Sequence, residues 1–173
     1  MEPGDIVCTR NPKGFTARMI RLGAALLDRP NTVNHVIVVS HRDPAGTLWG
    51  IEGRPGGVGY VDMKNAVRSP YTLNNGKQAK TEEQRQMVVH VAKGLIGTPY
   101  DWQGIIADGM KAIHAQELWC SSWKGQVPAQ VVCSSLADWV YDKVGLESPG
   151  AVFDRTVTPG DWADLITVRR WNL

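Results

Sequence analysis

The 173-residue chain is long enough for one domain with a buried core but short for two. Hydrophobic residues make up 43% and charged residues 21%, which is typical of a globular protein. The 19 basic and 17 acidic residues leave a net charge of +2 and form no basic patch, so the sequence does not predict binding to nucleic acid.

The N-terminal stretch and the cysteines determine the expected compartment. "MEPGDIVCTR" lacks the basic and apolar regions of a signal peptide, and no apolar run is long enough to span a bilayer. Cys8, Cys120 and Cys133 form no CxxC pair, so they predict neither disulfides nor a metal site, and we expect no cofactor. Reducing cytoplasm is the default, although a protein carried in a virion or released by lysis would show the same pattern.

The N-terminal part of the chain predicts strands with one helix among them. Residues 4–10, "GDIVCTR", form a short strand between turn signals, and residues 14–28 place apolar side chains at helical spacing. Residues 34–41, "NHVIVVSH", are almost wholly apolar and β-branched, as in a strand buried on both faces. Residues 46–53 and 56–63 follow turn sequences, so we expect an antiparallel meander.

The middle of the chain predicts one well-marked helix after a polar, irregular segment at 64–80. Thr81 and Gln84 have the spacing of a capping box. Apolar residues then recur at helical spacing, and Gly97 is placed to end the helix. The expected buried face consists of Met87, Val88, Val91, Ala92, Leu95 and Ile96.

The C-terminal part predicts two further helices and a closing strand. Residues 104–113 are expected to be helical, and from 133 to 144 the apolar residues follow a helical period that Gly145 ends. Residues 165–171, "LITVRRW", predict a strand. No repeat or linker interrupts the pattern, so we expect a single α+β domain over residues 1–173.

Cys133 occupies the first turn of its predicted helix, in "VVCSSLADWVY". Unpaired N–H groups and the helix dipole favour an anion there and would stabilise a thiolate, which is the attacking species of cysteine hydrolases. Free cysteine is also among the most buried residue types. Position alone therefore leaves two interpretations open, a nucleophile and a packing thiol.

His35 opens its predicted strand, and Glu52 lies on the next one. If the hairpin is centred on Asp43 and Pro44, residues whose numbers sum to 87 face each other, which pairs His35 with Glu52. Opposed Cβ atoms lie about 4.5–5.5 Å apart, so the carboxylate could orient the imidazole and stabilise its charged form. A slip of one residue would remove the pair, and Glu52 would then be a solvated strand residue.

Five motifs follow one another along the chain: "GDIV", "NHVIVV", "GIEGRPGGVGYV", "GTPYDW" and "VVCSSLADWVY". In this combination the chain resembles the circularly permuted branch of the NlpC-type papain-like hydrolases, the YiiX-like and lecithin:retinol acyltransferase-like group. In that branch, as here, the histidine strand precedes the cysteine helix. The resemblance spans residues 4–145 and implies a small antiparallel sheet or barrel packed on the cysteine helix. It implies Cys133 as nucleophile, His35 as base and Glu52 as the residue that orients the histidine.

Tyr100, in "GTPYDW", matches a tyrosine that lines the site near the oxyanion in this superfamily. Its hydroxyl could donate to an oxyanion beside the backbone N–H of Cys133, whereas the residues alone favour a core aromatic. The chain departs from the family pattern in an insert at residues 103–130, which is expected to form a lid, a wall of the substrate cleft or an extra core helix. The expected substrate contacts are Trp102, Trp119, Trp123 and Ser134.

These features predict a cysteine hydrolase that works through a thioester acyl-enzyme. A cell-wall (peptidoglycan) peptide is the first expected substrate, because the wider superfamily mostly cleaves such bonds. A lipid-directed esterase, amidase or acyltransferase is the alternative within catalysis. A structural or binding module that retains the fold without activity, for example in a virion, is the alternative outside it.

Overall fold

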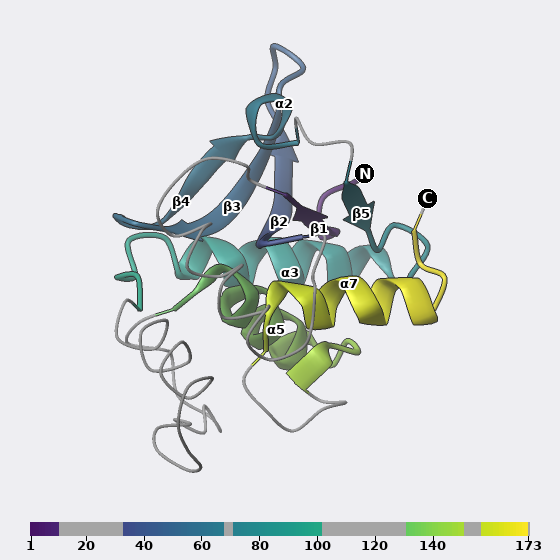
Figure 1. Ribbon diagram of the computed structural model, residues 1–173. Helices are drawn as coiled ribbons and strands as arrows, with labels where there is room; N and C mark the ends of the chain where they lie inside the picture. The colour runs from purple at the N-terminus through teal and green to yellow at the C-terminus, as the bar shows by residue number, and fades with distance from the viewer. Residues whose placement is uncertain (11–32, 68–70, 102–130, 151–156, 173) are drawn as a thin grey trace, which may run out of the picture.

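The structure, a computed structural model, describes residues 1–10, 33–67, 71–101, 131–150 and 157–172, and every structural statement below concerns these residues. They form a five-stranded antiparallel sheet with three helices, α3, α5 and α7, on one of its faces (Figure 1). The strand order is β4-β3-β2-β1-β5, so β2 lies in the middle. The predicted fold class, α+β with a small antiparallel sheet packed on the cysteine helix, is confirmed.

The strands follow the predicted meander closely. They are β1 (Ile6–Thr9), β2 (His35–Arg42), β3 (Leu48–Arg54), β4 (Gly57–Asp62) and β5 (Thr72–Asn74). The predicted irregular segment 64–80 is wrong in part, because it contains β5, which pairs with β1 at the sheet edge, and most of the single-turn helix α2 (Met63–Ala66). Side chains of β2 alternate between two apolar clusters, one toward the helices and one on the opposite face, which explains its unbroken apolar sequence.

Helix α3 (Glu82–Gly94) begins at the predicted capping box. The Thr81 hydroxyl accepts the N–H of Gln84 at 3.2 Å, and the Gln84 amide oxygen accepts the N–H of Thr81 at 2.9 Å. The expected buried face is wrong at its two ends, since Met87 is 49% and Ile96 40% exposed. The buried residues of this segment include Val89 instead, and the helix ends at Gly94, so Ile96 no longer shares the helical face.

Helix α7 (Pro159–Val168) replaces the strand expected at residues 165–171. The Thr158 hydroxyl accepts the N–H of Asp161, and Pro159 occupies the first turn, so the helix carries strong start signals upstream of the β-branched residues. Trp162 and Ile166 then fall on one buried face. Capping and burial at helical spacing therefore outweigh the strand propensity of "LITV".

Helix α5 (Cys133–Val144) ends at Gly145 in the left-handed conformation, as predicted. Its position is fixed through Tyr141, whose hydroxyl donates to the Gly4 carbonyl at 2.7 Å and accepts from the Asn75 amide at 2.8 Å. The edge of the Trp162 ring packs on Tyr141 with centroids 5.3 Å apart. These contacts attach α5 to the sheet and to α7, so the start of α5 has a fixed place.

Several expectations fall on other parts of the chain. The predicted helices at 14–28 and 104–113 and the insert at 103–130 lie outside the described residues. Among the helices that the structure describes, none has the length and apolar character to cross a bilayer.

Candidate active site

Cys133 is the first residue of α5 and is 2% exposed. The residue before it, Val132, has no side chain that could cap the helix, and the Ser135 hydroxyl instead accepts the N–H of Val132 at 3.0 Å. The N–H group of Ser134 is bonded to the Cys133 sulfur. A helix terminus capped in this way directs its partial positive charge at the thiol, which favours the thiolate.

His35 and Glu52 meet at the same end of the sheet, because β2 begins there and β3 ends there. The His35 Nε2 donates to the Glu52 Oε2 at 2.6 Å. Their side chains are 17% and 10% exposed, so water screens the contact only weakly. The expected contact between the two residues is therefore present.

The predicted register that led to this pair is wrong. Val38 lies opposite Ile51, so residue numbers across β2 and β3 sum to 89 at this end of the hairpin, and the pairing shifts by one between Val39 and His41. His35 and Glu52 are thus diagonal neighbours rather than directly opposed. An error of two residues keeps both side chains on one face, and diagonal neighbours remain within reach of long side chains.

Cys133 and His35 are joined by a side-chain hydrogen bond. Because Nε2 of His35 is engaged by Glu52, Nδ1 is the ring nitrogen left for the sulfur. Burial raises the pKa of the thiol, but the His35 charge and hydrogen bond and the N–H groups of Val36 and Ser134 lower it, and the lowering prevails. The surroundings of Cys133 therefore favour the thiolate form beside His35.

The pKa of His35 moves in the opposite direction. Burial alone would lower it, but the Cys133 thiolate and, next, the Glu52 carboxylate raise it well above the ordinary histidine value. Cys8 provides the contrast within the same core. Its thiol is fully buried, and burial, with a smaller contribution from Cys133, raises its pKa well above the ordinary cysteine value. Of the two described cysteines, only Cys133 has the setting of a reactive thiol.

Gly53 allows α5 to approach β3. A Cβ atom at this position would lie 3.3 Å from both the amide nitrogen of Cys133 and the carbonyl carbon of Val132. These are backbone atoms, which cannot rotate out of the way. The absence of a side chain at Gly53 therefore allows the short distance between the end of β3 and Cys133.

Tyr100 is brought to the cysteine by the backbone. Tyr100 and Val131 form a parallel bridge, in which the Asp101 N–H donates to the Val131 carbonyl and the Val131 N–H to the Pro99 carbonyl, each at 3.1 Å. Tyr100 is 7% exposed. Burial, followed by the charges of Cys133, Asp101 and Glu52, raises its pKa far above the ordinary tyrosine value, so the phenol stays protonated and can donate a hydrogen bond.

Of the four expected substrate contacts, the described residues include Ser134. Ser134 is 2% exposed, and its hydroxyl donates to the Val157 carbonyl at 2.7 Å, while its own carbonyl accepts from the Trp162 indole at 3.3 Å. These bonds hold the start of α5 against the segment before α7. Trp102, Trp119 and Trp123 lie outside the described residues.

Two members of the site were not predicted. The N–H of Val36 bonds to the Cys133 sulfur, so the strand that supplies the histidine also supplies a donor to the thiolate. Gly53 is the second. Its signal was the "EGR" sequence, a glycine inside a strand, which marks a bulge or a close backbone approach.

The α+β fold is shared with a solved protein. It is similar to the crystal structure of metalloprotein yiiX from Escherichia coli O157:H7, a DUF1105 protein, with a TM-score of 0.57 and 18% sequence identity. The alignment covers 83% of this chain and 66% of that one, so the chain spans just under two thirds of that protein. No family model and no curated protein matches the sequence.

The solved neighbour is described as a metalloprotein. In the parts of this chain that the structure describes, no group of three or more His, Cys, Asp or Glu side chains is arranged to hold a metal ion. The polar groups beside Cys133 are bonded in series, with His35 between the sulfur and Glu52, rather than converging on one point. These described residues do not fit a metal centre.

Proposed function

We propose that the protein is a cysteine hydrolase or acyltransferase that cleaves an amide or ester bond through a thioester on Cys133. The observation that carries the proposal is the series Cys133–His35–Glu52, with the cysteine at the start of a helix and the 2.6 Å contact behind the histidine. A thiol that only packs would need none of these partners, as Cys8 illustrates.

In the proposed reaction the Cys133 thiolate attacks the carbonyl carbon and the carbonyl π electrons move to oxygen. The Tyr100 hydroxyl and N–H groups at the start of α5 donate to that oxyanion. As the bond to the leaving group breaks, the His35 imidazolium gives its proton to the amine or alkoxide. His35 then takes a proton from water, which attacks the thioester, releases the acid and returns the thiolate.

A peptide amide of the bacterial cell wall is the first substrate we propose, and a lipid ester or amide is the second. The papain-like fold and the order of histidine strand before cysteine helix are compatible with both. Measuring the turnover of peptidoglycan fragments beside that of phospholipid and acyl-glycerol substrates separates the two. For either assignment, turnover must be lost in Cys133→Ala.

The proposal is tested without knowledge of the substrate. The alkylation rate of each cysteine by iodoacetamide is measured against pH by peptide mass spectrometry, in the wild type and in His35→Ala. We expect Cys133 to react rapidly below pH 7 and to lose that advantage in the variant, because the imidazolium no longer stabilises the thiolate.

Cys8 is the internal control, since its raised pKa and full burial predict slow alkylation in both proteins. An inert Cys133, or one that titrates near the free-thiol value of about 8.5 with or without His35, would overturn the proposal. The protein would then be a structural or binding module that has kept the fold.

A further inference from the structure

The second oxygen of the Glu52 carboxylate faces a cation. Arg54 Nη1 lies 3.6 Å from Glu52 Oε1, whereas His35 contacts the other oxygen, Oε2. Glu52 is 10% exposed at its side chain and Arg54 is 53% exposed. The buried carboxylate is thus held between an imidazole and a guanidinium that remains partly in water.

The Arg54 guanidinium lies beside Gly59. In the β3–β4 register Gly59 lies opposite Glu52, two positions from the partner of Arg54. A Cβ atom on Gly59 would lie 3.4 Å from Arg54 Nη2, so the guanidinium lies across the bare backbone at this position. Gly59 does not adopt a positive φ, so its backbone does not require glycine. Glycine weakens the interior of a strand, and the space it leaves here is filled by the guanidinium.

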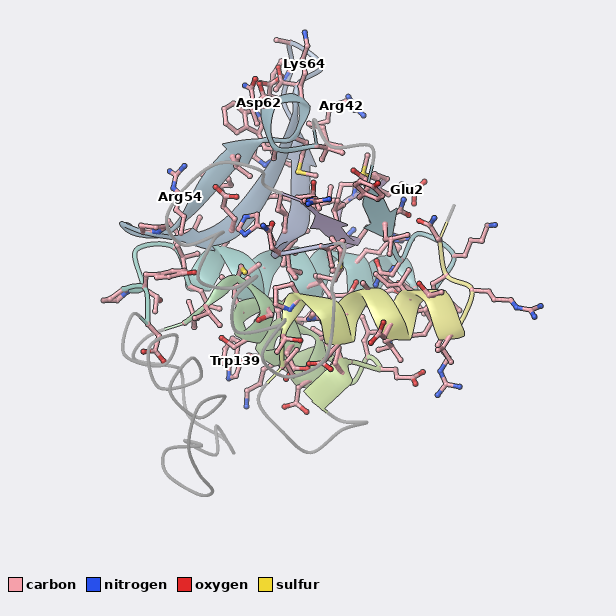
Figure 2. All side chains as sticks on the ribbon, viewed as in Figure 1. Glu2, Arg42, Arg54, Asp62, Lys64 and Trp139 are labelled. Atoms are coloured by element: carbon pink, nitrogen blue, oxygen red, sulfur yellow. The ribbon has the colours of Figure 1, made fainter. Side chains whose placement is uncertain are left out.

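We propose that Arg54, lying across Gly59, is a positioning residue that extends the series to Cys133–His35–Glu52–Arg54. This inference rests on the proposed function. The guanidinium pairs with Oε1, which leaves Oε2 aimed at His35. Figure 2 shows Arg54 at the β3–β4 end of the sheet, far from Arg42, which extends from the opposite end of β2.

Arg54 also adds positive potential to a site with several ionisable groups. The groups around Cys133 and Glu52 on the neighbouring elements are Cys8 on β1, His35 on β2, Arg54 on β3, and Tyr100 and Asp101 after α3. Removing one positive charge near a thiol makes that thiol harder to ionise. The pH at which the Cys133 thiolate forms therefore rises when Arg54 is neutralised.

The experiment is the pH profile of Cys133 alkylation in Arg54→Gln, Arg54→Lys and Gly59→Val. Exposed ion pairs have modest effects, so we expect Arg54→Gln to lower the rate about two- to threefold on the acidic limb while the high-pH plateau is unchanged. Arg54→Lys should restore part of the alkylation rate at acidic pH, because lysine keeps the positive charge but lacks the planar, two-pronged guanidinium group. The pH profile of Gly59→Val should resemble that of Arg54→Gln. The valine side chain moves the Arg54 guanidinium away from Glu52, although the arginine itself is retained.

Arg42→Gln is the matched control, because it removes the same charge from an exposed side chain bonded to the Gly46 carbonyl at the far hairpin. Urea midpoints confirm that each variant is folded. An Arg54→Gln profile that coincides with wild type, or a lower plateau with no change in the limb, would overturn the role of Arg54 and leave the proposed function standing. An unreactive wild-type Cys133 would overturn both.

Discussion

The substitution Glu52→Gln examines the series at its central contact. Glutamine keeps the size of the side chain and can still accept from Nε2 of His35, but it removes the negative charge. The 2.6 Å contact and the low exposure of both side chains mean that this charge acts on the imidazole with little screening. The variant therefore measures how strongly Glu52 favours the imidazolium.

The expected magnitude follows from the contacts of the carboxylate. A carboxylate close to an ionisable group changes that group's pKa by about one to three units. The Arg54 charge, 3.6 Å from the other oxygen, offsets part of this effect. We therefore expect Glu52→Gln to reduce the proton affinity of His35 by about ten- to a hundredfold, which is about 1.4–2.7 kcal/mol.

The assay is an NMR titration of the His35 ring in wild type, Glu52→Gln, Cys133→Ser and the double variant. Cys133 contributes more than Glu52 to the raised pKa of His35, so Cys133→Ser should lower that pKa further than Glu52→Gln does. The double variant should bring it below the ordinary histidine value, because burial then outweighs the hydrogen bonds to neutral partners that remain. A His35 pKa that is equal in wild type and Glu52→Gln would refute the reasoning.

Two further predictions concern stability and geometry. Unfolded His35 loses its proton near pH 6.5 and unfolded Cys133 near 9.0. In the folded protein the pKa of His35 is raised and that of Cys133 is lowered, and a pair that is a thiolate beside an imidazolium holds one proton throughout that interval. The pair's contribution to the free energy of unfolding is the difference between wild type and His35→Ala/Cys133→Ser, measured with urea. It should therefore rise up to pH 6.5, stay level to pH 9.0 and fall above pH 9.0. A slope between pH 6.5 and 9.0 would contradict the ion pair. Gly53→Ala should lower the alkylation plateau of Cys133 several-fold without moving its pH midpoint, because the new methyl group displaces backbone and changes no charge. Gly94→Ala is the control, because a Cβ atom at Gly94 meets no atom within 4 Å. Equal plateaus in the two variants would refute the role of the close approach at Gly53.

The sequence was informative where a local rule and burial agree. The capping box at Thr81 and the left-handed Gly145 are set by neighbouring residues, and both are present as predicted. The strand predicted at residues 165–171 is wrong, because β propensity is outweighed there by the upstream Thr158 cap and by burial at helical spacing.

The site was predicted in part for a reason that can be stated. His35 and Glu52 were paired by an assumed hairpin centre between residues 43 and 44, whereas Arg42 lies opposite Leu48, which puts the centre at residue 45. The bulge near Ser40 then shifts the pairing by one, so the error at the His35 end is two residues. Only the alternation of strand faces, which survives an error of two, was needed for the contact. The Val36 N–H and the Gly53 approach depend on how α5 meets the sheet, and no pattern within a single strand or helix encodes that meeting.

The Tyr100–Val131 bridge has a consequence for how this scaffold can be varied. It places Val131, two residues before Cys133, beside Tyr100. The entropy cost of closing a loop grows only with the logarithm of its length. Segments of very different length can therefore be exchanged between these two anchors while Tyr100 and Cys133 keep their places. This point is a natural junction for grafting specificity, and a chimera that carries a short linker there should retain the reactive thiol.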